Sequence, residues 1–185
     1  MKIPMGSAFS PSMIAVFSAY PVCGVIDLKK NRWKTYAGWI LLSEAVGGLS
    51  GLLNRSGMEW YNTAVIKPPL SPPPVAFPIA WGILYALMGV GMARVWLTPP
   101  SPGRSRSLRL FLLQLGFNFI WSFLFFAFRS YGLAFFWLAV LWILIVRMIL
   151  SFYDQDRPAA WLQLPYLLWV LFAAWLNLGV WKLNG

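Results

Sequence analysis

Five long apolar stretches, separated by short polar segments, fill most of this 185-residue chain. A helix needs about 20 apolar residues to cross a hydrocarbon layer of about 30 Å, and stretches near this length run over 36–53, 75–97, 110–128, 133–150 and 159–181. Lipid offers no partner to a bare backbone N–H or C=O, so each stretch is expected to be a helix. The pattern predicts an all-α, multi-pass membrane domain of five helices over residues 35–185.

Residues 1–34 precede this domain and have a different pattern. Their apolar part, 13–28, is short, contains Pro21 and Asp27, and is followed by a basic run. A secretory signal peptide carries its positive charge before the apolar segment and a small-residue cleavage site after it, whereas here most of the charge follows. We interpret residues 1–34 as a leader that is interfacial or partly buried, and a sixth span over 13–28 is the alternative.

Composition supports lipid as the solvent of the chain and removes one class of partner. The sequence is 59% hydrophobic and 11% charged, with a mean hydropathy of +0.66, far from the values of a soluble domain. A net charge of +10 would suggest nucleic acid for a soluble protein. Here the basic residues lie mostly at the ends of spans, so they report orientation, and no nucleic-acid partner is expected.

The distribution of basic residues predicts the direction of insertion. Of the fifteen Lys and Arg residues, those on the side opposite the start of the first span are Arg55, Lys67, Arg129 and Lys182. Cytoplasmic loops carry the excess of Lys and Arg. The first span should therefore start on the cytoplasmic side, and the C-terminus should lie on the opposite side.

The reactive residue types that most enzymes need are scarce. The chain has one cysteine, Cys23, and no histidine, so disulfides within the chain, multi-cysteine metal sites, histidine-ligated haem and histidine-activated nucleophiles are excluded. Four of the five acids fall in loops or in the leader, which leaves no pair of carboxylates for acid–base catalysis. We expect no catalytic residues, no metal site and no required cofactor.

Three spans each carry a face on which polar and aromatic side chains recur at spacings of three and four. Amides and hydroxyls can join helices in lipid, at about 0.6 to 2 kcal/mol per contact. Matching rows of rings are not needed for that role and favour a pocket for a flat, largely apolar ligand. The three faces are Trp81, Tyr85, Met88, Met92 and Trp96; Gln114, Asn118, Trp121, Ser122 and Phe125; and Gln163, Tyr166, Val170, Ala173 and Asn177, flanked by Trp169.

The first span carries Glu44 on nearly the same side as Gly47, Gly48 and Gly51. A carboxylate within a membrane is expensive and is a functional candidate for that reason. A protonated carboxyl bonded to a neighbouring amide would be a sufficient structural explanation, and we favour this helix-packing role. The Gly47-x-x-x-Gly51 pattern lets another helix approach closely, within one protomer or across a homodimer.

The segment over 60–74, which begins at Trp60, has proline at five of its last seven positions. Proline favours an extended backbone with few hydrogen bonds. This segment could be a lid over the mouth of the bundle or a rigid spacer between two spans. The segment over 98–107 is rich in Pro, Ser and Arg, which predicts a solvated connector.

Several of these segments together resemble the TspO/MBR family, also called the translocator protein, peripheral-type benzodiazepine receptor or tryptophan-rich sensory protein family. The resemblance covers about residues 36–184 and is specific, because four blocks occur in order at the spacing of five spans. The blocks are W-Y at Trp60 with K-P-P-L-S-P-P from Lys67, W-G-I-L-Y-A-L-M-G from Trp81, Q-L-G-F-N-F-I-W-S-F-L-F-F from Gln114, and P-Y-L-L-W-V-L-F-A-A-W-L-N from Pro165.

The resemblance implies a five-helix membrane receptor, often dimeric, that binds tetrapyrroles such as protoporphyrin, and in some members sterols or benzodiazepine-type ligands. Its pocket is closed by the loop between the first two spans. Without histidine, metal-free protoporphyrin is favoured over haem. Carried over by position, the family's ligand-binding residues are Asn118, Trp121, Trp169, Ala173 and Leu176, and its lid residues are Lys67, Pro68 and Leu70.

Two further activities remain as alternatives under this resemblance. One is transport or export of the same ligands across the membrane. The other is light-dependent breakdown of porphyrin, which in bacterial members has been linked to a tryptophan in the loop. This chain has Leu70 in the part of the loop where many members have an aromatic residue, and the difference counts against that enzymatic activity.

Overall fold

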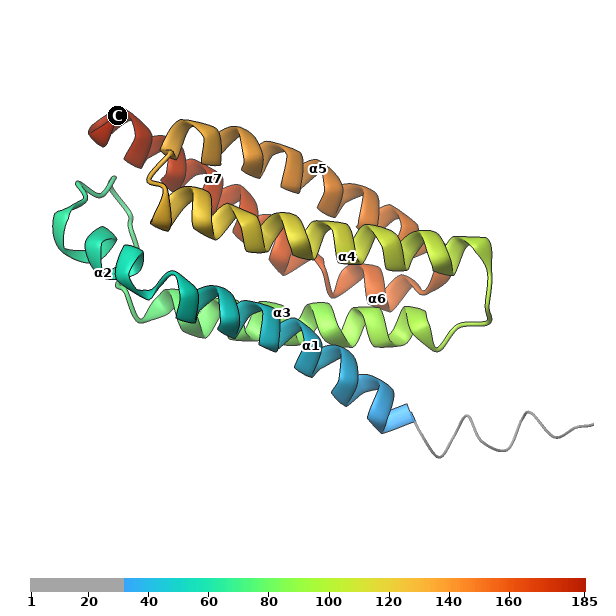
Figure 1. Ribbon diagram of the computed structural model, residues 1–185. Coiled ribbons are helices and arrows are strands. Elements are labelled where there is room, and N and C mark those ends of the chain that lie inside the picture. Colours follow the sequence, from blue (N-terminus) through green and yellow to red (C-terminus); the bar gives the residue numbers. More distant parts are fainter. Residues whose placement is uncertain (1–31) are drawn as a thin grey trace, which may run out of the picture. The chain divides into compact units, whose positions relative to one another are not determined.

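The computed structural model describes residues 32–185. The leader therefore lies outside the described residues except for its last three, and so does the alternative sixth span over 13–28. The elements, drawn in Figure 1, are α1 (Arg32–Leu53), α2 (Arg55–Ala64), α3 (Ala76–Trp96), α4 (Pro102–Ser122), the π-helix η2 (Phe123–Ala127), α5 (Tyr131–Gln155), α6 (Arg157–Trp161) and α7 (Leu164–Asn184).

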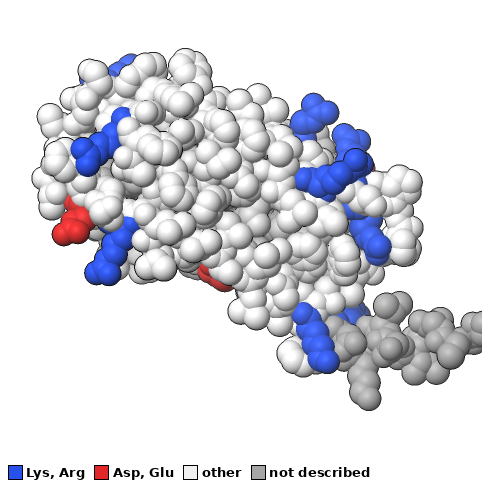
Figure 2. All heavy atoms as spheres, in the orientation of Figure 1, with Lys and Arg blue, Asp and Glu red and all other residues white. Residues whose placement is uncertain are grey.

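The prediction of five membrane-spanning helices is confirmed. Five helical segments of the described chain are long and apolar enough to cross a membrane: Arg32–Leu53, Ala76–Trp96, Pro102–Ala127, Tyr131–Gln155 and Arg157–Asn184. Figure 2 shows basic side chains at both ends of the described bundle, with a broad and largely uncharged surface between them. That band is the part of the surface that suits acyl chains.

The prediction of a solvated connector over 98–107 is wrong in its second half, because α4 already begins at Pro102. The Ser101 side chain accepts a hydrogen bond from the Arg104 N–H at 3.0 Å, and Pro102 stands at the first helical position. A serine cap followed by proline is a strong signal for the start of a helix. The connector was predicted from the polar composition of residues 98–107, which does not distinguish a helix cap from a loop.

The prediction of an extended path over 60–74 is also wrong at its start. Trp60–Ala64 belong to the short helix α2, and the non-helical path begins at Val65. The final span is interrupted as well, since α6 and α7 are separated at Leu162 and Gln163. Pro165 has no N–H with which to bond the carbonyl of Trp161, so one hydrogen bond of a continuous α-helix is missing there.

Packing within the bundle is uneven. Helix α4 runs along α5, and α5 along α7 (Figure 1). Helix α1 is the most exposed span. Of the 18 residues in its most apolar stretch, 11% are buried, against 39% for α3. It approaches α3 closely at Gly89, where an added Cβ would lie 2.5 Å from the Ile40 Cα. Only glycine permits this backbone contact.

Asp156 organises the turn at one end of the bundle. Its carboxylate accepts two hydrogen bonds from the Arg94 guanidinium, each at 3.0 Å, and a third from the Ala159 N–H at 2.8 Å. The first two bonds tie the end of α3 to the turn between α5 and α6, and the third caps α6. One side chain therefore fixes where three helices meet.

We expect Asp156→Ala to lower the free energy of unfolding by about 1 to 2 kcal/mol, because it removes a helix cap and a bidentate ion pair together. Unfolding in detergent followed by circular dichroism measures this. The matched control is Asp154→Ala, which removes an exposed carboxylate two residues away and should change stability by less than about 0.5 kcal/mol. Equal losses in the two variants would contradict the assignment.

Candidate functional site

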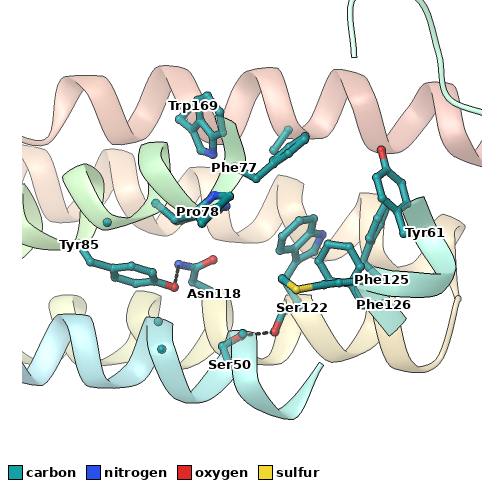
Figure 3. Close-up of a pocket in the computed structure, with 18 of the residues that line it drawn as sticks. Ser50, Tyr61, Phe77, Pro78, Tyr85, Asn118, Ser122, Phe125, Phe126 and Trp169 are labelled. Atoms are coloured by element: carbon teal, nitrogen blue, oxygen red, sulfur yellow. Dashed lines mark hydrogen bonds between the residues drawn. The ribbon is translucent and has the colours of Figure 1, made fainter. Parts of the chain in front are cut away.

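A cavity of about 490 Å³ lies between α1, α3, α4 and α7, with α2 and η2 at one end. Nine residues from the three predicted faces and from the family's ligand site lie on its wall together with Asn177, and Figure 3 shows several of them. They come from three spans that are far apart in sequence, so only the packing of the helices brings them together. They are Trp81, Tyr85, Asn118, Trp121, Ser122, Phe125, Trp169, Ala173 and Leu176. Seven other members of the predicted faces do not line the cavity: Met88, Met92, Trp96, Gln114, Gln163, Tyr166 and Val170.

The wall contributed by α1 contains the four residues assigned to helix packing, Glu44, Gly47, Gly48 and Gly51. Only Gly47 makes a close approach. The ring of Tyr85 packs directly on it, so that an added Cβ would collide with that ring. An added Cβ on Gly48 or Gly51 would meet no atom within 4 Å. The glycine motif thus serves contact within the protomer at Gly47 and leaves open space elsewhere, and the homodimer stays a prediction.

Polar side chains on α4 bind three neighbouring helices. The Asn118 amide donates to the Tyr85 hydroxyl of α3 at 3.0 Å, and the Ser122 and Ser50 hydroxyls are 2.5 Å apart (Figure 3). One turn before Asn118, the Gln114 Oε1 accepts from the Tyr166 hydroxyl of α7 at 2.9 Å. Gln114 is fully buried and does not line the cavity. These bonds join helices, as amides and hydroxyls do in lipid, and two of the three residues also face the cavity.

Aromatic rings form much of the remaining wall. The Trp81 ring lies 5.4 Å from the ring of Tyr85 and 6.4 Å from that of Trp169, the latter edge to face. On the α4 side, Trp121 stacks on Phe125 at 5.4 Å with 29° between the planes. Such contacts stabilise ring positions before any ligand enters. The cavity is therefore bounded by rings whose orientations are already set.

Several wall residues were not predicted from the sequence. Phe77 and Pro78 enter from the first turn of α3, Phe126 from the π-helix, and Met58, Tyr61 and Asn62 from α2. The π-helix holds a Phe128 N–H to Phe123 O bond of 2.8 Å, which changes the direction of the side chains that follow Ser122. Periodicity calculated for an α-helix cannot anticipate this rotation. Tyr61 and Asn62 were missed because the segment over 60–74 was expected to be extended, and Met58 lies just before it.

Tyr61 places a phenol at the α2 end of the cavity. Its ring is 5.5 Å from that of Phe125, and the Lys67 Nζ lies 5.3 Å from its ring centre. Burial raises the pKa of the Tyr61 phenol above its ordinary value. The hydroxyl is therefore neutral at physiological pH and remains able to donate a hydrogen bond.

The predicted lid residues lie next to the cavity and do not line it. The Pro68 ring packs against Gly179 of α7, and the Lys67 Nζ donates to the Asn62 carbonyl at 3.3 Å. The Trp60 ring faces outward against the Arg129 guanidinium at 4.1 Å. Leu70 is 83% exposed.

The loop after α2 is tied to the end of α7. The Ile66 N–H donates to the Asn184 Oδ1 and the Asn184 amide donates back to the Ile66 carbonyl, both at 2.9 Å. Leu70 has a φ of 64°, a left-handed conformation that is costly for a residue with a side chain. A loop held in this way acts as a fixed support for α2, and α2 supplies the wall.

Two polar groups of the wall have no hydrogen-bond partner. The amide of Asn177 and the indole N–H of Trp121 are both buried without one among the described residues. Buried polar groups are normally bonded, and each unbonded group calls for an explanation. Both groups have almost no accessible surface, and Asn54 Oδ1, Trp142 Nε1 and Gln163 Oε1, which belong to residues outside the cavity wall, are unbonded as well. Within residues 32–185, no group of three or more His, Cys, Asp or Glu side chains is placed to hold a metal ion.

Comparison with known proteins gives the family. The TspO/MBR family model matches residues 39–182. The chain belongs to the TspO/MBR family. It is 36% identical over 151 residues to the tryptophan-rich protein TspO of Chlorobaculum tepidum, which covers 81% of this chain and 96% of that protein.

More distant TspO/MBR relatives are matched over similar lengths. Identity is 34% over 155 residues with the translocator protein of Bos taurus, covering 82% of this chain and 91% of the relative. It is 33% over 126 residues with the tryptophan-rich sensory protein of Cereibacter sphaeroides, covering 68% and 77%. Together with the five spans, the family places this chain among integral, multi-pass membrane proteins.

Two leucine substitutions should change stability in opposite directions. Asn177→Leu removes a buried amide without partners, so the ligand-free protein should gain about 1 kcal/mol of unfolding free energy. Asn118→Leu leaves the Tyr85 hydroxyl unbonded and should cost a similar amount. Unfolding of the two purified variants in the same detergent tests this. A loss of stability in both would show that Asn177 has a partner within the protein.

Proposed function

We propose that this TspO/MBR protein is a membrane receptor that binds a flat, largely apolar ligand of the tetrapyrrole class, such as metal-free protoporphyrin, inside the helix bundle. One observation carries the proposal. Trp81, Trp121 and Trp169 line a single cavity from three different helices. Contact between helices alone does not require three indole rings around one open space.

The size of the cavity supports a ligand of this class. Its volume of about 490 Å³ lies within the range of about 300 to 1,000 Å³ that is typical of small-molecule sites. Stacking a macrocycle on each favourable ring contributes about 0.5 to 1.5 kcal/mol beyond the burial of apolar area. The rings of Trp81 and Trp169 stand nearly perpendicular, with 83° between their planes, so they can contact a flat ligand by face and by edge.

The polar groups of the wall would orient such a ligand. The Trp121 indole offers a donor, and the Asn177 amide offers a donor and an acceptor. Both groups have almost no accessible surface in the ligand-free wall, so their side chains would have to turn toward a ligand before they could bond it. The names of the relatives, a sensory protein and a translocator, are compatible with ligand binding as the common step.

We further propose that α1 starts on the cytoplasmic side, which puts α2 and the C-terminus on the opposite side. The motivation is the excess of Lys and Arg on the first side. The test uses Cys23→Ser as background, with single cysteines introduced by Glu59→Cys or Asp154→Cys. A membrane-impermeant maleimide should label Glu59→Cys in intact cells and Asp154→Cys only after lysis. The reverse pattern would invert the topology.

Ligand binding itself is tested by filling the cavity. Titration of the purified protein with protoporphyrin should quench tryptophan fluorescence to saturation. Gly48→Leu places a side chain in open space within the cavity and should weaken binding at least tenfold without loss of stability. The matched control is Gly38→Leu, on the same helix and outside the cavity, where an added Cβ also meets nothing. Unchanged affinity in Gly48→Leu would place the ligand elsewhere.

A further inference from the structure

A second hollow lies at the end of the bundle where α2, α5 and α7 come together (Figure 1). It measures about 520 Å³ and shares no wall residue with the cavity described above. Its wall includes Trp60 and Val65 from the end of α2, Arg129 and Leu133 around the start of α5, and Trp181 of α7. Polar and apolar groups both line it, which suits a molecule that carries parts of both kinds.

The hollow lies at the level of the membrane surface. Arg129 belongs to the turn over 128–130, which joins the span that ends at Ala127 to the span that begins at Tyr131. A turn between two spans lies where the hydrocarbon ends. Trp60 and Trp181 line the same hollow, and tryptophan is enriched at this level. Since the phosphates of phospholipids occupy this level too, a lipid headgroup is the molecule next to the hollow.

The hollow carries one formal charge, and it is positive. Of the described residues that line it, Arg129 is the one that is charged. Within residues 32–185, the Arg129 guanidinium takes part in none of the salt bridges or hydrogen bonds. Glu59, the acid beside Trp60 in the sequence, neither lines the hollow nor forms an ion pair with Arg129. The donors of this guanidinium are therefore left to an anion from outside the chain.

The position of Arg129 is fixed by its surroundings. Its guanidinium lies over the Trp60 ring, 4.1 Å from the ring centre, and a guanidinium on a ring still presents its N–H edge to a phosphate. Its φ is 53°, a left-handed conformation that disfavours a long side chain and is held only where the surroundings impose it. The turn alone would favour Gly or Asn, so the side chain rather than the backbone explains an arginine here.

The wall next to Arg129 is apolar and tightly packed. The Trp181 indole lies directly on Gly132, where an added Cβ would be 2.8 Å from the Trp181 Cε2. Val65 and Leu133 add aliphatic surface to the same hollow. A phosphate on Arg129 would thus have rings and aliphatic side chains beside it for the glycerol backbone and the first methylenes of the acyl chains.

We propose that this hollow binds the headgroup of an anionic phospholipid from the adjacent leaflet, and that Arg129 pairs with its phosphate. The proposal does not depend on the ligand of the central cavity. A headgroup that also carries an ammonium group, as in phosphatidylcholine, would bring a positive charge close to the guanidinium, and no acid lines the hollow to receive it. Phosphatidylglycerol is therefore preferred over phosphatidylcholine.

The test is titration calorimetry of the purified protein in one nonionic detergent. Three compounds are compared: dihexanoylphosphatidylglycerol, dihexanoylphosphatidylcholine, and glycerophosphoglycerol, which is the first headgroup without acyl chains. Arg129→Asn removes the charge and is tolerated in a left-handed conformation. Trp60→Leu keeps the charge and removes the ring beneath it. The matched control is Arg55→Asn, which removes an exposed arginine of α2 that lines neither hollow.

The unmodified protein should bind the phosphatidylglycerol saturably and at least fivefold more tightly than the phosphatidylcholine, and it should give no saturable heat with glycerophosphoglycerol. Arg129→Asn should weaken the affinity for the phosphatidylglycerol at least tenfold, because charge-assisted hydrogen bonds to the phosphate are lost. Trp60→Leu should weaken it at least threefold, and Arg55→Asn should leave it unchanged. Circular dichroism verifies that each variant is folded.

Four results would overturn this inference. One is the absence of saturable heat with the phosphatidylglycerol, and another is an affinity for it that is the same in folded Arg129→Asn and in Arg55→Asn. The third is equal affinity of the unmodified protein for the two lipids. The fourth is equally tight binding of glycerophosphoglycerol, which would assign the hollow to a soluble anion. If Arg129→Asn does not fold, an unchanged affinity in Trp60→Leu overturns the inference in its place.

Discussion

The polar face of α4 is the constraint on which the rest of the bundle depends. In lipid, apolar helices gain little by leaving the solvent for one another, so hydrogen bonds and close packing decide which helices meet. Gln114, Asn118 and Ser122 recur every fourth residue and bond to side chains of α7, α3 and α1 respectively. These three residues align four spans along one line. Loss of any one bond would leave a polar group unsatisfied in an apolar medium, which is why the arrangement is specific.

The same face changes its role along its length. Gln114 is fully buried between helices, whereas Asn118 and Ser122 line a cavity. Space is available there because the facing part of α1 consists largely of glycine, with Gly48 and Gly51 leaving room where side chains would otherwise pack. The rings that line this space are held by one another, and Glu44 is the one acid among the described residues that line it. The packing of the helices and the wall of the cavity therefore depend on neighbouring positions of the same two helices.

Sequence reasoning succeeded where one physical rule dominates. The need of every buried backbone group for an internal partner made the five spans visible as five apolar stretches. Helical periodicity grouped Trp81 with Tyr85, and Asn118 with Ser122, and the structure places all four residues on one cavity. The same reasoning failed in the segments between spans. The early start of α4 depends on a serine cap, and helix α2, which has no side-chain cap, depends on contacts with other elements. Composition reports neither.

The sequence by itself determined that this protein spans a membrane, that it belongs to the TspO/MBR family, and which helix faces carry its polar and aromatic residues. These properties are local, because they follow from hydropathy, spacing and motifs along one segment at a time. Only the tertiary structure decided that the faces meet around one cavity, that a π-helix adds Phe126 to its wall, and that Asn177 is left without a partner. Those properties depend on how side chains of separate helices fill the space between them, and no single segment contains that information.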